Sequence, residues 1–204
     1  MSKPLTLLIA LVIVVGALFI IRSYNHREEG ISSKEVVSPT AQASKSKDWR
    51  EFSSVSGHFK VMLPALPQHV SDNIVDPKTK ELRRYETFVA ADDDGEAFMI
   101  SVITFSHNVE QEVGGDSLKA VIDDMLSRKT TNKLQLMNPG TLNTFKTLDF
   151  SIINGDRIIA GKAFAKGNTV YLLSMIDNND RFKTHDFGFF VNSFEIVDSK
   201  PKKD

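Results

Sequence analysis

The feature that most constrains this chain is an apolar run at its start. Residues 4–21 read PLTLLIALVIVVGALFII, 18 residues without a charge. A helix of this length spans ~27 Å, close to the ~30 Å hydrocarbon core of a bilayer. It would be apolar on all sides, which disfavours a buried helix of a water-soluble core. We therefore predict a transmembrane helix whose anchoring side chains are Leu5, Leu7, Leu8, Ile9, Leu11, Val12, Ile13, Val14, Val15, Leu18, Phe19, Ile20 and Ile21.

Two interpretations of this run compete, an uncleaved signal-anchor and a cleaved signal peptide. A signal peptide usually has an apolar core of ~7–15 residues followed closely by a cleavage site of small residues. Here the run is longer, and Ala41-Gln42-Ala43 lies well beyond it, so we favour the anchor. The flanking charges, Lys3 before the run and Arg22 and Arg27 after it, leave the orientation open. A short tail ahead of a long domain favours placing that domain outside the cytoplasm.

The rest of the chain divides by composition. Residues 22–47 contain six Ser and no periodic apolar pattern, which predicts a disordered polar linker. Such a coil has an end-to-end distance on the order of 28 Å. We expect a short N-terminal tail at 1–3, the anchor at 4–21, the linker at 22–47, one folded domain at 48–198 and a charged tail at 199–204.

The predicted domain is acidic. Residues 48–198 carry 16 Lys and Arg against 22 Asp and Glu, a balance that repels phosphates and argues against nucleic acid as a partner. The chain has no Cys, so it has neither disulfides nor a lipidated cysteine.

Alternating apolar residues predict several antiparallel strands. Residues 59–63 alternate, and 85–91 and 98–105 flank an acidic loop at 92–96. The segment 98–105 is apolar on both faces, so we expect it to be central or covered. Residues 148–152 lead through Asn154-Gly155 into 157–165, and Lys166-Gly167-Asn168 turns the chain into 170–176, while a short strand is expected at 133–137.

Two helices interrupt these strands. Apolar residues from Leu118 to Leu126 follow the helical period, with Asp116 or Ser117 as the expected N-cap. A second helix is predicted at about 180–192, capped by Asn179 or Asp180. The order of elements predicts the α+β class: a twisted antiparallel sheet flanked by helices.

Several short motifs are spread over this domain. They are Trp49-x-x-Phe52, Gly57-x-Phe59-x-Val61-x-Leu63-Pro64-x-x-Pro67 in an opening hairpin, Asp116-Ser117-Leu118 and Ser193-Phe194. With these residues the domain resembles the PsbP-like superfamily, including the bacterial DcrB-like group, over nearly all of residues 48–198. The resemblance implies an αβα sandwich and a non-enzymatic role at a membrane-associated complex. It also implies an envelope protein, since DcrB-like members are envelope lipoproteins, and here a helix would replace the lipid.

No motif predicts a catalytic residue, a metal ligand or a cofactor. Asp92-Asp93-Asp94-Gly95 suggests calcium, but an EF-hand loop needs Glu at its twelfth position, where this chain has Ile103. We therefore interpret the acidic loop as a solvated hairpin tip. None of the five His has the spacing of helical zinc ligands.

The sequence thus predicts a single-pass protein of the bacterial inner (cytoplasmic) membrane, with its domain on the periplasmic side. The expected function is non-enzymatic binding or assembly in the cell envelope through a protein partner. An alternative is a carrier of an apolar ligand between sheet and C-terminal helix, in a candidate groove of Phe182, Phe189 and Phe190. A hydrolase is the least favoured hypothesis, because no nucleophile–base pair is evident.

Overall fold

The computed structural model describes residues 48–76, 80–112 and 115–197. The predicted anchor at 4–21, the linker at 22–47 and the tail at 199–204 lie outside these residues. Of the helices that are described, none has the length and apolar character to cross a bilayer.

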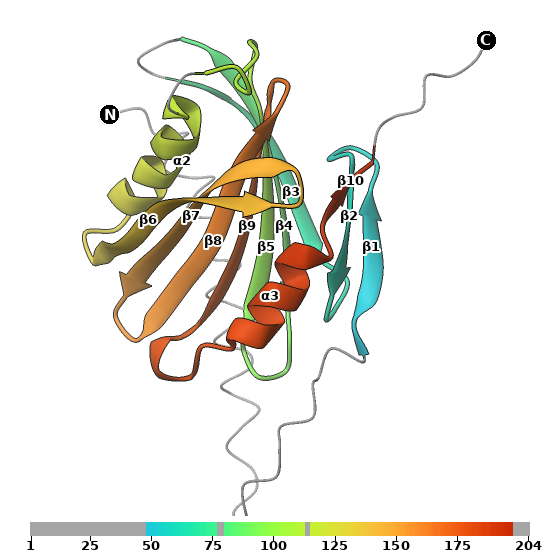
Figure 1. Ribbon diagram of the computed structural model, residues 1–204, viewed down its shortest axis with the longest axis vertical. Helices are drawn as coiled ribbons and strands as arrows, with labels where there is room; N and C mark the ends of the chain where they lie inside the picture. The colour runs from blue at the N-terminus through green and yellow to red at the C-terminus, as the bar shows by residue number, and fades with distance from the viewer. Residues whose placement is uncertain (1–47, 77–79, 113–114, 198–204) are drawn as a thin grey trace, which may run out of the picture.

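The described residues form two antiparallel sheets (Figure 1). The large sheet has seven strands in the order β3-β4-β5-β9-β8-β7-β6, and the small sheet has three in the order β1-β2-β10. The bounds are β1 Arg50–Ser54, β2 Phe59–Leu63, β3 Gln68–Val75, β4 Leu82–Ala91, β5 Ala97–Thr104, β6 Asn132–Leu142, β7 Phe145–Asn154, β8 Arg157–Lys166, β9 Thr169–Asn178 and β10 Glu195–Ile196.

The alternation pattern correctly predicted most of the large sheet. The strand expected at 98–105 is β5, and it lies between β4 and β9 with apolar residues buried on both of its faces. The turn expected at Asn154-Gly155 lies one position later. Asn154 pairs with Arg157, so the two loop residues are Gly155 and Asp156. Gly155 adopts φ 65° there, a conformation that costs glycine little.

Three features of the sheets differ from the expectation. The strand predicted at 133–137 extends over Asn132–Leu142, because a mostly exposed edge strand shows little alternation in its sequence. The strand β3 was not predicted, for the same reason. The opening hairpin does not join the large sheet: β2 pairs with β1 and with β10 from the end of the chain.

Each face of the large sheet carries its own hydrophobic cluster. On β9, Tyr171, Leu173 and Met175 face one cluster, while Val170 and Leu172 face the other. The first cluster includes Phe59 of the small sheet and Phe190 of the C-terminal helix. The second includes Val121 and Ile122 of the other helix. The expected antiparallel sheet with a helix on each face is therefore confirmed, with the small sheet as an addition to one face.

Helix α2 (Asp116–Ser127) covers the second face, against β6, β7 and β8. The predicted apolar stripe from Leu118 to Leu126 packs against that cluster. The predicted N-cap is wrong, because Gly115 occupies that position with φ 68° and makes no side-chain cap. Glu112 instead accepts hydrogen bonds from the backbone N–H and the hydroxyl of Ser117, both at 2.8 Å.

Helix α3 (Thr184–Asn192) lies beside the small sheet on the first face (Figure 1). It begins four residues later than predicted, because a single 3₁₀ turn, η2 (Asn179–Arg181), comes first and Phe182 has a non-helical backbone (φ −54°, ψ 122°). The expected caps Asn179 and Asp180 therefore lie in η2, and Lys183 occupies the N-cap position without a side-chain cap bond.

Candidate functional site

The three phenylalanines predicted to line an apolar groove have different environments. Phe190 is fully buried in the first cluster, with its ring centroid 5.4 Å from that of Phe98. Phe189 is half-buried and contacts the Trp49 ring edge-on at 5.3 Å. Phe182 precedes α3 and packs on the rim of the cluster, 6.0 Å from the Phe187 ring. All three rings are thus engaged in packing with other side chains of the domain.

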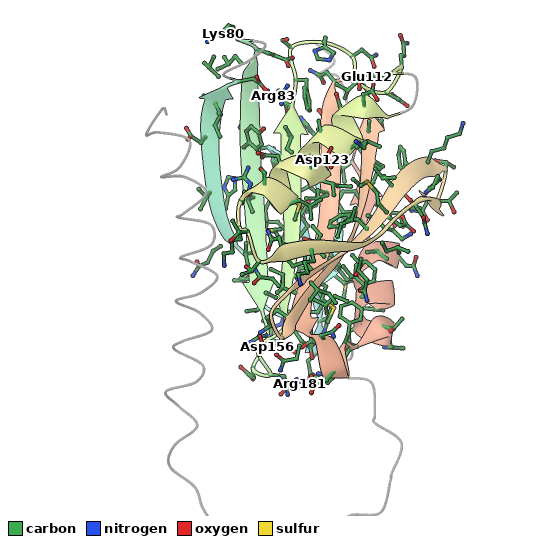
Figure 2. All side chains as sticks on the ribbon, turned by 90° about the vertical axis from the view of Figure 1, so that its left-hand side faces the viewer. Lys80, Arg83, Glu112, Asp123, Asp156 and Arg181 are labelled. Atoms are coloured by element: carbon green, nitrogen blue, oxygen red, sulfur yellow. The ribbon has the colours of Figure 1, made fainter. Side chains whose placement is uncertain are left out.

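A group of charged side chains lies at the β4–β5 hairpin, at the end of the domain where Figure 2 labels Arg181. Asp92, Asp94 and Glu96 each place one carboxylate oxygen within 4.8 Å of the other two. The loop folds around Asp92, whose Oδ1 accepts hydrogen bonds from the backbone N–H groups of Asp94 and Glu96, both at 3.0 Å. An Asp at a turn makes such bonds to residues that follow it, so the sequence itself brings these carboxylates together.

Lys183, at the start of α3, supplies a positive charge to this cluster. Its Nζ lies 3.1 Å from Asp94 Oδ2 and also contacts Glu96 Oε1. Glu96 is 2% exposed, so this ammonium neutralises a carboxylate that is almost completely removed from water. The ion pairs therefore connect the hairpin to α3.

Asp177, at the end of β9, is a further buried carboxylate near Glu96, but it lies outside the group of three oxygens within 4.8 Å of one another. Ala97 pairs with Ile176, so Glu96 and Asp177 occupy the next opposed positions and project from the same face of the sheet. Asp177 is 1% exposed. Its Oδ1 accepts the Asn178 backbone N–H at 2.7 Å, but within the described part of the chain its Oδ2 has no hydrogen-bond partner.

Burial and mutual repulsion both affect the acidities here. The pKa of Glu96 is raised to about 7: loss of water contact is the main cause, repulsion by Asp92 and Asp177 adds to it, and Lys183 opposes it. Burial also raises the pKa of Asp92. Burial lowers the pKa of Lys183, but hydrogen bonds to Glu96 and Asp94 outweigh this and raise it above its usual value. Lys183 therefore stays protonated beside carboxylates that repel one another.

The sequence located only part of this cluster. The acidic loop was interpreted as a solvated tip. Asp93 is exposed as expected, but Glu96 is buried and pairs with Lys183, which directly precedes α3. Asp177 and Lys183 are far from the loop in sequence and carry no local motif. An isolated Asp at the end of an apolar strand was the one available signal for Asp177.

A second buried carboxylate, Glu86 on β4, joins the small sheet's β1–β2 loop to the large sheet. Glu86 is 3% exposed. Its Oε2 accepts a hydrogen bond from the Ser56 hydroxyl at 2.5 Å and lies 3.2 Å from His69 Nε2. Its Oε1 lies 2.9 Å from Arg84 Nη2. In a hydrolytic triad the imidazole lies between the serine and the acid. Here the carboxylate lies between them, and the His69 ring stacks on Phe88 at 4.3 Å, so this arrangement cross-links two elements and does not activate Ser56.

Comparison with known proteins shows similarity of structure. No protein-family model and no curated protein matches the sequence. The structure is similar to the solution structure of cyanobacterial PsbP (CyanoP) from Synechocystis sp. PCC 6803, with a TM-score of 0.49 and 12% identity over 79% of this chain and 99% of that one. A crystal structure from Bacteroides thetaiotaomicron VPI-5482 gives a TM-score of 0.43 and 12% identity over 74% of this chain and 49% of the other.

Proposed function

We propose that this protein is a membrane-tethered, non-enzymatic binding or assembly module of the bacterial cell envelope that docks a protein partner. The apolar run at 4–21 would hold it in the inner membrane, with the domain on the periplasmic side. In this proposal the chain is a DcrB-like relative in which a helix replaces the lipid anchor. The docking proposal rests on a difference between the two edge strands of the large sheet. Strand β6 has features that prevent pairing with a further strand, and β3 lacks them.

The edge strand β6 has features that discourage the addition of another strand. It contains Pro139, and its pairing with β7 shifts between Leu134 and Leu136. Proline cannot donate a hydrogen bond, and a bulge bends the edge away from a flat partner. Natural sheets use both devices to keep their edges unpaired.

The opposite edge strand, β3, lacks these devices. Its eight residues contain no Pro or Lys and pair with β4 without a shift. The backbone N–H of Asn73 donates to Asp72 Oδ1 at 2.7 Å, so it bonds to a side chain of its own strand. As an edge strand, β3 leaves one side of its backbone outside the sheet, and an extended segment of a partner would pair with the groups on that side. We therefore propose β3 as the docking edge.

Site-directed crosslinking can test this proposal, because the chain has no Cys of its own. Asn73→Cys on β3 and Asn138→Cys on β6 place single thiols at exposed positions on opposite edges. In intact membranes, we expect a thiol crosslinker on Asn73→Cys to capture one defined protein, and Asn138→Cys to capture much less of it. Equal capture from both edges would refute docking at β3. No capture from any exposed position would refute the partner-binding function.

A further inference from the structure

We infer that the loop at residues 64–67, between β2 and β3, is a membrane-contact loop that inserts Leu66 into the lipid bilayer. This contact rests on the proposed membrane anchor at 4–21, and it gives the domain a binding surface separate from the docking edge β3. Three observations support it: the composition of the loop, the exposure of Leu66, and the position of the loop beside the start of the domain.

The loop contains only apolar side chains. It reads Pro64-Ala65-Leu66-Pro67, between the end of β2 and the start of β3. Turns favour Gly, Pro, Asn, Asp and Ser, each for its backbone conformation or its local hydrogen bonds. The two prolines fit this preference, but Ala65 and Leu66 at the centre of the loop do not. Their presence at the surface therefore calls for a role other than turning the chain.

Leu66 presents its side chain to the outside of the domain, since it is 83% exposed. A Leu side chain favours an apolar phase over water by roughly 10–100-fold when it is fully buried there. Pro67 restricts the preceding residue to extended conformations, so inserting Leu66 costs less conformational entropy than inserting a residue of a flexible loop. Single exposed apolar side chains are common at protein surfaces, and the position of this one gives it a partner.

Val55 provides the comparison within the same small sheet. It is 88% exposed, but it lies in the β1–β2 loop between Ser54 and Ser56. Ser54 pairs with Phe59 at that end of the hairpin, whereas Arg50 pairs with Leu63 at the other end. Val55 and the loop at 64–67 therefore lie at opposite ends of the β1–β2 hairpin.

The membrane-contact loop lies at the end of the domain where the predicted linker joins it. Because Arg50 pairs with Leu63, Asp48 and the loop at 64–67 lie at the same end of the small sheet. Figure 1 shows β1 beginning at the lower end of the domain. A flexible linker over 22–47 would keep this end at a distance on the order of 28 Å from the bilayer. Contact with the bilayer is then intramolecular, so a weak insertion is sufficient.

The other side chains at this end favour apolar contact over charge attraction. Trp49 is half-buried, with its ring 4.8 Å from that of Phe98, and Trp is enriched where proteins meet the membrane interface. This contact places the β4–β5 hairpin at the same end, where Asp93 is exposed. Anionic lipids attract basic residues and repel such a carboxylate. The partner surface is therefore a zwitterionic bilayer, entered by an apolar side chain.

A fluorescent label in the loop tests this contact. The chain has no Cys, so Ala65→Cys and Val55→Cys each place one dye at an exposed position. The full chain is reconstituted into phosphatidylcholine vesicles that carry a quencher on their acyl chains. We expect strong quenching at Ala65→Cys and little at Val55→Cys. Adding Leu66→Asp to Ala65→Cys should lower the insertion equilibrium at least about tenfold, and phosphatidylglycerol should not strengthen insertion.

Flotation of the full chain with the vesicles separates failure of the contact from failure of the anchor. A chain that does not float would refute both. Insertion of Leu66 alone is refuted if the chain floats but the dye at Ala65→Cys is unquenched, or is quenched no more than the dye at Val55→Cys. Quenching that persists with Leu66→Asp would show that the dye itself inserts, and a requirement for phosphatidylglycerol would assign the contact to charge; either result overturns it. Circular dichroism checks folding, and Leu66→Ser replaces Leu66→Asp if the latter is unfolded.

Discussion

Glu112 Oε2 accepts a hydrogen bond from the backbone N–H of Ser117 at 2.8 Å, and so satisfies the start of α2 from outside the helix. The first N–H groups of a helix have no partner within it. The residues expected to satisfy them, Asp116 and Ser117, belong to the helix itself. Figure 2 shows Glu112 at the same end of the domain as Arg83.

The first prediction concerns this capping bond. Glu112→Ala should lower the free energy of unfolding by about 1 kcal/mol, the usual cost of a lost helix cap. Glu112→Gln, which keeps an acceptor oxygen, should lose less. Asp116→Ala is the control, because Asp116 is exposed and makes no cap bond. Urea denaturation of the three variants measures the differences; an equal loss for Asp116→Ala would contradict this account of the cap.

The second prediction compares two neighbouring phenylalanines of α3. Phe190→Ala should destabilise the domain by about 3–5 kcal/mol, because it removes a fully buried ring and leaves a cavity. Phe189 is only half-buried, against Trp49, and Phe189→Ala should cost less than half as much. Thermal unfolding ranks the two. A larger loss for Phe189→Ala would mean that its contact with Trp49 matters more than burial in the main cluster.

The third prediction compares two glycines with opposite surroundings. A Cβ at Gly161 would lie 2.4 Å from the Phe150 ring and 2.7 Å from the backbone oxygen of Leu173. Gly161→Ala should therefore destabilise by about 1–3 kcal/mol through overpacking. Gly188 lies within α3 with nothing within 4 Å of such an atom, so Gly188→Ala should stabilise by about 0.5–1 kcal/mol. Chemical denaturation tests both signs, and destabilisation by Gly188→Ala would show that the helix needs glycine there.

The fourth prediction concerns His107, which bridges two carboxylates at the end of the domain near α2. Its Nδ1 lies 2.8 Å from Glu81 Oε1 and its Nε2 lies 3.1 Å from Glu112 Oε1. Hydrogen bonds to Glu112 and then Glu81 raise the pKa of His107 above its usual value. A raised pKa stabilises the fold below the unfolded-state pKa, and this stabilisation is lost as the pH rises through the folded-state pKa.

We therefore expect His107→Gln to destabilise the protein more at about pH 5 than at about pH 9. Urea denaturation at both values measures the difference, and an NMR titration of the imidazole reports the folded-state pKa directly. Glu81 stays ionised in the folded protein at both pH values, because hydrogen bonds from Ser106, Arg83 and His107 outweigh burial and hold its pKa at about 2. A loss that is independent of pH would assign His107 a packing role only.

Local sequence patterns predicted the elements that bury many apolar residues. Strands β2, β4, β7 and β8 and the apolar stripe of α2 were predicted because burial of one side imposes a period of two or 3.6 residues. Strands β5 and β9 are buried on both faces and were predicted as apolar runs bounded by turns. The edge strand β3 was missed and β6 was predicted too short, since exposed strands carry a weak pattern. The start of α3 was placed too early because Asn179 and Asp180 are also suited to the short 3₁₀ turn that they form.

The sequence by itself determined the apolar run at 4–21, the acidity of the domain, the antiparallel α+β class and the hairpin that gathers Asp92, Asp94 and Glu96, because each depends on nearby residues. Only the tertiary structure decided that β2 pairs with β10, that Glu112 satisfies the start of α2, and that Lys183 pairs with the acidic hairpin. These relationships bring together residues from different elements. They depend on how the strands pair and how α3 packs on the sheet, which no local pattern records.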